Sequence, residues 1–137
     1  MTKAYSLDTS TCIDVIRPTN LKARHQFEQA VADGHEIVIS SIVLHELTFG
    51  VSRSKHPQRS SAALNFFLGG VSVLDFTADD AVSSGHIRAN LTDRAMSIGP
   101  FDTLIAGQAL RRNLIMVTGN VREFSRVKHL VVVNWSR

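Results

Sequence analysis

The 137-residue chain contains a single cysteine and no apolar run that approaches the roughly 20 residues needed to cross a bilayer. One cysteine cannot form an internal disulfide, so we expect Cys12 to be a small core residue. The N-terminal segment MTKAYSLDTS has no long apolar stretch followed by a small-residue cleavage site, which is the pattern of a secretory signal. These absences favour a soluble protein of the cytoplasm.

The histidines show no spacing typical of a metal site. They match neither a Cys/His zinc motif nor the two-histidine helix of metalloproteases, because the segment HELTF has no second histidine. No glycine-rich phosphate loop is present, and the chain has no internal repeat, low-complexity segment or linker. Its length and its 44% hydrophobic content suit one globular domain, residues 1–137.

Basic residues exceed acidic residues only slightly, 15 to 12, which gives a net charge of +3 and a pI near 9.5. Such an excess suits a polyanionic partner without requiring one. Two groups of basic side chains are candidates for contacts with the phosphates of a nucleic acid, and the alternative is an ordinary solvated surface. The candidates are Arg53, Lys55 and Arg59 in one group, and Arg111, Arg112, Arg122, Arg126 and Lys128 in the other.

Short β-branched segments alternate with segments of helical periodicity. Strands are predicted at 5–8, 36–40, 71–76, 114–118 and 130–135, and helices at 9–17, 21–34, 42–51, 62–70, 77–95, 102–112 and 120–126. Helix starts are predicted at Thr9 or Ser10, at Ser40 or Ser41 and at Thr77, and helix ends at Pro18 and Gly34. Strands alternating with helices predict an α/β fold whose mainly parallel sheet is covered by helices on both faces.

Three acidic residues stand in apolar surroundings at strand ends or helix starts. Asp8 ends the first predicted strand, Glu46 lies in the second turn of the helix after the second strand, and Asp102 begins the helix before the fourth strand. The carboxyl ends of parallel strands meet at one edge of a sheet, where functional groups collect. Oxygen ligands of this kind suit a hard cation such as Mg²⁺ or Mn²⁺.

Each acid also has a simpler explanation. Asp8 and Asp102 could be helix caps, and the helix dipole could favour Glu46. Thr118 and Asn120, after the fourth strand, could be turn residues. Capping does not account for Glu46 one turn inside an apolar helix, so a shared site is the favoured interpretation.

The segments SLDTSTCID, ISSIVLHELTFG, IGPFDTLIAGQAL and MVTGNVREFSRV occur in one order along nearly the whole chain. In this order the chain resembles the PIN-domain ribonucleases, specifically the VapC toxins of bacterial toxin–antitoxin modules. The resemblance implies a three-layer α/β/α domain, a Mg²⁺-dependent or Mn²⁺-dependent endoribonuclease and a homodimer of the toxin. It also implies a VapB-type antitoxin that blocks the site. The nearest branch cleaves initiator tRNA in the anticodon region, which makes tRNA the leading substrate.

Asp8, Glu46 and Asp102 fall on acidic positions of that family. The resemblance implies that Asp8 and Asp102 hold the metal ion, directly or through water, while Glu46 orients or deprotonates the attacking water. Thr118 is expected to position Asp8 or a water molecule.

The chain departs from the family pattern at two positions. Asn120 stands where many PIN domains have a fourth aspartate, and the nearby Glu123 is a candidate replacement. Ser10 stands where the usual motif has asparagine, and it can still form a hydrogen bond. The number of metal ions, one or two, stays open.

Two other functions agree less well with the sequence than a metal-dependent ribonuclease does. A non-catalytic nucleic-acid or protein-binding module would keep the fold and lose the acids, which are all present here. A phosphoacceptor of the response-regulator type would need paired acids after the first strand and a lysine after a late strand, and the segment VTGN has no such lysine.

Overall fold

The computed structural model describes residues 1–17 and 19–137, and these residues form one sheet of five parallel strands in the order β3-β2-β1-β4-β5. The strands are β1 (Ala4–Leu7), β2 (Glu36–Ser40), β3 (Ser72–Leu74), β4 (Ile115–Val117) and β5 (Val132–Val133). Every neighbouring pair is parallel, which confirms the predicted α/β class. The predicted helix end at Pro18 lies outside the described residues.

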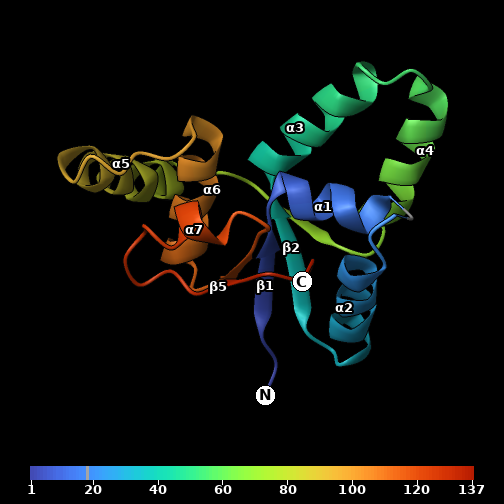
Figure 1. The fold of residues 1–137 in the computed structure, drawn as a ribbon, viewed down its shortest axis with the longest axis horizontal. Helices are drawn as coiled ribbons and strands as arrows, with labels where there is room; N and C mark the ends of the chain where they lie inside the picture. Colours follow the sequence, from blue (N-terminus) through green and yellow to red (C-terminus); the bar gives the residue numbers. More distant parts are fainter. Residues whose placement is uncertain (18) are drawn as a thin grey trace.

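Helices cover both faces of this sheet. Figure 1 shows α1 and α2 on one side of the strands, α5, α6 and α7 on the other, and α3 and α4 as a hairpin beyond the carboxyl ends of β1 and β2. The helices are α1 (Thr9–Ile16), α2 (Leu21–Ala32), α3 (Ser41–Ser52), α4 (Pro57–Leu68), α5 (Ala78–Asp93), α6 (Pro100–Arg111) and α7 (Val121–Phe124). Within the described residues, no helix has the length and apolar content needed to cross a lipid bilayer.

The central strand β1 determines where the first acid lies. Leu7 pairs with Val117 of β4, and Ser6 pairs with Val38 of β2, so the end of β1 is enclosed by strands on both sides. Leu7 is fully buried in the core. The backbone N–H of Asp8 then donates to the carbonyl of Val117 at 3.1 Å, which places Asp8 at the carboxyl edge in the middle of the sheet.

Most helix boundaries follow the predicted caps. Ser40 caps α3 and Thr77 caps α5, as predicted, and Gly34 has a φ of 79° just after α2. The predicted cap of α1 at Thr9 or Ser10 is wrong, because Asp8 is the N-cap.

Helix α4 begins five residues before its predicted start. Pro57 occupies the first turn of α4, where a missing N–H costs nothing, so this proline starts the helix instead of interrupting the chain. The loop between α3 and α4 is correspondingly short.

A buried aspartate joins α5 to the C-terminal end of α6. Asp80 is fully buried and accepts hydrogen bonds from Arg111 Nε at 2.7 Å, Arg112 Nη2 at 3.0 Å and Gln108 Nε2 at 3.0 Å. Its carboxylate also accepts from the backbone N–H of Thr77, which completes a capping box. Burial alone raises the pKa of Asp80, but the guanidinium of Arg112, the Thr77 N–H and the other donors outweigh it and hold the pKa well below its usual range. This cluster fixes α6, the helix that carries Asp102, against α5.

The same two helices approach each other closely at Gly107. A Cβ at this position would lie 2.5 Å from the Cβ of Ser84, so only glycine allows the observed packing of α6 on α5. The Ser83 hydroxyl donates to the Gly107 carbonyl at 2.9 Å across the same contact.

We predict that Asp80→Asn lowers the free energy of unfolding by about 2 kcal/mol at pH 7. This is less than the loss expected when a fully buried ion pair is broken, because Arg111 and Arg112 are partly exposed. The folded-state pKa of Asp80 is depressed, so its stabilisation is present above the unfolded pKa of about 3.9 and is lost as the pH falls below it. Urea unfolding at pH 7 and pH 3 measures the difference, and Asp79→Asn, at an exposed position of the same turn, is the control. Equal losses at both pH values would contradict the prediction.

Candidate active site

Asp8 is held in place by donors from the start of α1. It is buried, with 4% of its surface exposed, and its Oδ1 accepts from the backbone N–H of Thr11 at 2.9 Å. The Ser10 hydroxyl donates to the same carboxylate, 3.2 Å from Oδ1 and 3.3 Å from Oδ2. Asp8 is therefore a helix cap and a site residue at once, and Ser10 forms the hydrogen bond that the sequence predicted for it.

Glu46 projects from α3 toward the start of α1. Its side chain is half-buried, and its Oε1 accepts a hydrogen bond from the Thr9 hydroxyl at 2.6 Å. Thr9 was predicted only as a cap, so its contact with Glu46 is a functional feature that the sequence interpretation missed. The available signal was the run of hydroxyl residues directly after Asp8.

Asp102 lies in the first turn of α6, whose N-cap is Gly99 and not Asp102. The alternative of a simple helix cap is therefore wrong for Asp102. Burial contributes most to raising its pKa, the negative charges of Asp8, Glu46 and Glu123 contribute the rest, and together they take the pKa from the ordinary 3.8 to about 6. The carboxyl group of Asp102 thus interacts electrostatically with acids from three other segments of the chain. We call this set the carboxylate cluster: Asp8, Glu46, Asp102 and Glu123.

The turn after β4 contributes to the cluster through Glu123. Of the two candidates for the fourth acidic position, Asn120 is exposed and Glu123 is the half-buried acid whose charge reaches Asp102. The buried hydroxyl of Thr118 accepts from the backbone N–H of Asn120 at 2.8 Å. Thr118 therefore shapes this turn, and the hydrogen bonds that hold Asp8 come from Thr11 and Ser10 instead.

The donor set of the carboxylate cluster fits a hard divalent cation. Its atoms are carboxylate oxygens, and after burial, the largest cause, repulsion from Asp8, Glu46 and Glu123 also raises the pKa of Asp102. Among residues 1–17 and 19–137, no group of three or more His, Cys, Asp or Glu side chains is already arranged to hold a metal ion. Mg²⁺ does not need such a group, because it is usually bound by one or two carboxylates and several water molecules. Asp8 and Asp102 are the two carboxylates that the sequence predicts for this role.

A groove of about 570 Å³ begins at Glu46 and runs between α1, α3 and α4. Leu47, Gly50 and Val51 form part of its wall, and the cationic side chains of Arg17, Lys55 and Arg59 line it as well. We call it the basic groove. Two predicted RNA-binding residues, Lys55 and Arg59, thus share a groove with Glu46, together with Arg17, which the sequence interpretation missed.

The other basic candidates lie elsewhere. Arg111 and Arg112 are engaged by Asp80, and Arg126 donates to the carbonyl of Ser97 at 3.1 Å, so these contacts favour structural roles. Lys128 lines a separate pocket beside α5. Arg53 and Arg122 are exposed. For this group, RNA binding stays a prediction.

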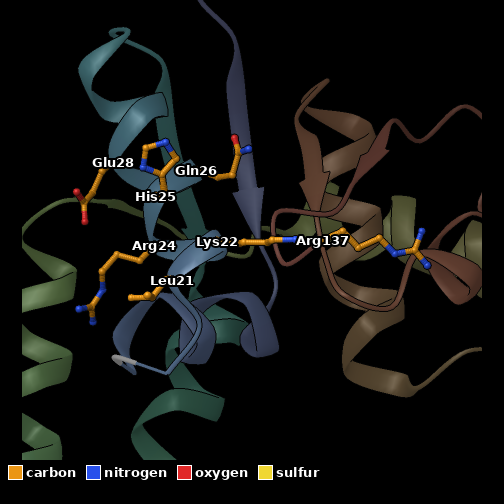
Figure 2. Close-up of a pocket in the computed structure, with 7 residues that line it drawn as sticks. All are labelled: Leu21, Lys22, Arg24, His25, Gln26, Glu28 and Arg137. Atoms are coloured by element: carbon orange, nitrogen blue, oxygen red, sulfur yellow. The ribbon is translucent and has the colours of Figure 1, made fainter.

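A second pocket of about 570 Å³ is lined by residues of α2 and by the C-terminal Arg137 (Figure 2). None of the four acids of the carboxylate cluster lines it. In Figure 2, Lys22 extends toward Arg137, whereas Arg24 and Glu28 point away from it. Arg24 itself donates to the carbonyls of Val15 and Ile16, which ties α2 to the end of α1. The diverging side chains make this surface a weaker candidate than the carboxylate cluster.

Comparison with known proteins agrees with this architecture. The pattern that defines the PIN domain matches residues 5–130. The tRNA(fMet)-specific endonuclease VapC of Shigella flexneri is 40% identical over 134 residues, covering 96% of this chain and 98% of the relative. Ribonuclease VapC2 of Rickettsia felis is 36% identical over 133 residues, covering 97% of this chain and 98% of the relative.

Two solved complexes have the same fold. VapBC2 from Rickettsia felis, bound to a DNA fragment from its promoter, superposes with a TM-score of 0.90 at 35% identity, covering 96% of this chain and 98% of the other. DNA-bound VapBC from Salmonella typhimurium gives 0.89 at 37% identity, covering 98% and 99%. The chain belongs to the PIN-domain family and, within it, to the VapC family. PIN-domain ribonucleases generally depend on a divalent metal ion.

We predict that Asp102→Asn raises the melting temperature in EDTA at pH 8 by about 2–4 °C. That shift corresponds to roughly 1 kcal/mol, once solvent screening of a half-exposed carboxyl is allowed for. The folded-state pKa of Asp102 lies above its unfolded value, so the charged carboxylate destabilises the fold as the pH rises from about 4 through 6. The gain should therefore vanish at pH 4, where wild-type Asp102 is protonated.

The measurement is a thermal melt of both proteins in EDTA at pH 4 and pH 8. Glu28→Gln, at an exposed position of α2, removes the same charge away from the cluster and should leave the melting temperature unchanged. A lower melting temperature for Asp102→Asn at pH 8 would show that Asp102 supports the fold and does not oppose it.

Proposed function

We propose that this chain is the toxin of a toxin–antitoxin pair and acts as an endoribonuclease that hydrolyses phosphodiester bonds in RNA, with Mg²⁺ as its cofactor and Mn²⁺ as a substitute. The observation that carries the proposal is the convergence of Asp8, Glu46 and Asp102: Thr9, next to Asp8, donates to Glu46, and the charges of Asp8 and Glu46 add to the effect of burial on the pKa of Asp102. The substrate proposed is tRNA, and initiator tRNA first, because the Shigella flexneri and Salmonella typhimurium relatives are named tRNA(fMet)-specific endonucleases.

The chain's own residues divide the work in this mechanism. Asp8 and Asp102 would hold the ion, and Ser10 and Thr11 keep Asp8 in position. When bound, the ion polarises the scissile phosphate and makes a water molecule easier to ionise.

Glu46 orients the attacking water and accepts its proton. Because Thr9 donates to Oε1 of Glu46, the other carboxylate oxygen remains to face the water. Hydrolysis by water leaves a 5′-phosphate and a 3′-hydroxyl.

Substrate binding requires positive charge beside this negative cluster. The basic groove provides it, because Arg17, Lys55 and Arg59 line a channel that starts at Glu46. Contacts of these side chains with RNA phosphates would hold the strand without neutralising the acids.

The proposed partner is a VapB-type antitoxin. The solved relatives from Rickettsia felis and Salmonella typhimurium are VapBC complexes, and they match nearly the whole of this chain. We propose a homodimer of the toxin within such a complex, and the cytoplasm as its location.

A non-catalytic binding module with the same fold is the alternative. Repulsion within the carboxylate cluster costs folding free energy, as the raised pKa of Asp102 indicates. A module without chemistry would have no need for this cost, so the cluster favours an enzyme.

We predict that the purified protein cuts initiator tRNA at one or a few positions with Mg²⁺ or Mn²⁺ and that EDTA stops the reaction. Asp102→Asn should abolish cleavage, since it removes a metal ligand, whereas Glu28→Gln should cleave like the wild type. Gel analysis of end-labelled tRNA, with enzymatic tests of the product ends, measures both the position and the chemistry. Products with 2′,3′-cyclic phosphates, or cleavage that persists in EDTA, would contradict hydrolysis by water. They would indicate instead that the ribose 2′-hydroxyl attacks the phosphate.

We also predict that the cognate antitoxin inhibits by occupying the carboxylate cluster with a basic side chain. A guanidinium can pair with carboxylates that are left uncovered without metal. Titration calorimetry of the toxin with antitoxin, with and without millimolar Mn²⁺, should show that each weakens the other's binding. Independent affinities would remove this explanation of inhibition and leave the nuclease proposal intact.

A further inference from the structure

An exposed aromatic pair stands beside the carboxylate cluster. His45 directly precedes Glu46 on α3, and Phe101 directly precedes Asp102 on α6. Their rings contact each other across the two helices, with centroids 5.8 Å apart and planes tilted by 50°. Phe101 is 44% exposed, and His45 is exposed as well. This contact therefore lies at the mouth of the site and outside the core.

Phe49 extends the pair along α3. It follows His45 by four residues, which places both on one side of the helix, and it is 64% exposed. Leaving such side chains in water forgoes the free energy that burying them would release. We call these residues the aromatic strip: Phe49, His45 and Phe101.

On α3, the aromatic strip and the basic groove fall on opposite sides of Glu46. Successive residues of an α-helix are about 100° apart. Leu47, Gly50 and Val51, which line the groove, are therefore turned to one side of Glu46, and His45 and Phe49 to the other. A strand that crosses the cluster would meet cationic side chains on one side and aromatic rings on the other.

The chemistry of the cluster explains why an uncharged surface is useful there. Its carboxylates repel the phosphates of RNA, and a cation placed among them would compete with the metal ion. Base stacking on an aromatic ring provides affinity without charge, and every nucleobase has a face that can stack. The histidine ring can also form a hydrogen bond with a base edge.

We propose that the aromatic strip is a stacking surface for unpaired nucleobases next to the scissile phosphate, and that it makes the protein prefer single-stranded or looped RNA. The proposal rests on the ribonuclease function above. It identifies Phe101 as a substrate-binding residue and the basic groove as the phosphate-binding half of the same path. An exposed apolar strip could also cover a second copy of this chain, and the experiment distinguishes that outcome.

The first experiment measures steady-state cleavage of an anticodon stem-loop by Phe101→Ala, Phe101→Leu and Phe101→Trp. Stacking acts on binding, so Phe101→Ala should raise KM about tenfold, with kcat within twofold of the wild type. Phe101→Leu keeps the apolar bulk without the aromatic face and should also raise KM. Phe101→Trp keeps an aromatic face, so its KM should stay close to that of the wild type. Phe66→Ala, at an 89% exposed aromatic on α4, is the matched control and should change neither constant.

Salt separates stacking from charge. The effect of Phe101→Ala on KM should persist between 50 and 300 mM salt, because stacking releases no counterions. The effect of Lys55→Ala, in the basic groove, should shrink over the same range. The stacking proposal would be overturned if the effect of Phe101→Ala on KM vanished with added salt, or if Phe101→Leu had the KM of the wild type.

The second experiment measures RNA binding in the absence of cleavage. In the Asp102→Asn background, fluorescence anisotropy measures the affinity for a short labelled single-stranded RNA and for the same RNA with abasic sites. Phe101→Ala should weaken binding of the intact RNA about tenfold and leave binding of the abasic RNA unchanged. This assay decides the stacking proposal even if no RNA is cut, which would overturn only the nuclease function.

Two results would overturn the aromatic strip as an RNA surface. One is equal affinity of Phe101→Ala and its parent for the intact RNA. The other is a change in oligomeric state, measured by light scattering, with RNA affinity unaltered, which would assign the strip to an interface between two copies of the chain.

Discussion

Repulsion among carboxylates is the constraint on which this structure depends. Asp8, Glu46, Asp102 and Glu123 come from four segments, and burial together with the charges of the other three acids raises the pKa of Asp102 to about 6. A chain free to relax would separate these charges, so the rest of the protein must hold them together. The central strand does this for Asp8, because β1 is enclosed by β2 and β4 and ends where Asp8 begins α1.

Neutral hydrogen-bond donors around the cluster oppose that repulsion. Thr9, Ser10 and the N–H of Thr11 donate to Glu46 or Asp8 from one turn of α1, which links two acids through a single short segment. Asp102 has no such donor among the hydrogen bonds of the described residues, and its helix is held from the far end, where Asp80 binds the last turn of α6. The stabilising ion pairs thus lie away from the site, and the destabilising charges lie within it. This separation is typical of a site maintained for function.

Helix α3 organises the surface around the cluster. Glu46 lies between the basic groove and the aromatic strip, so α3 borders both surfaces: its Leu47, Gly50 and Val51 line the groove, whose cations come from other segments, and its His45 and Phe49 face the aromatic side. A polyanion with unpaired bases is the partner that fits all three.

The sequence by itself determined the alternation of strands and helices, most of the caps and the three principal acids, because local hydrogen bonding and side-chain periodicity act over a few residues. Strand 36–40 and the cap at Ser40 were predicted from that information alone and are confirmed. Only the tertiary structure decided that Glu123 reaches Asp102, that Thr9 binds Glu46, and that Arg111 and Arg112 pair with Asp80. It also brought His45 against Phe101. These pairings join residues 21 to 56 positions apart, and their distances depend on how whole helices pack on the sheet, which no local pattern records.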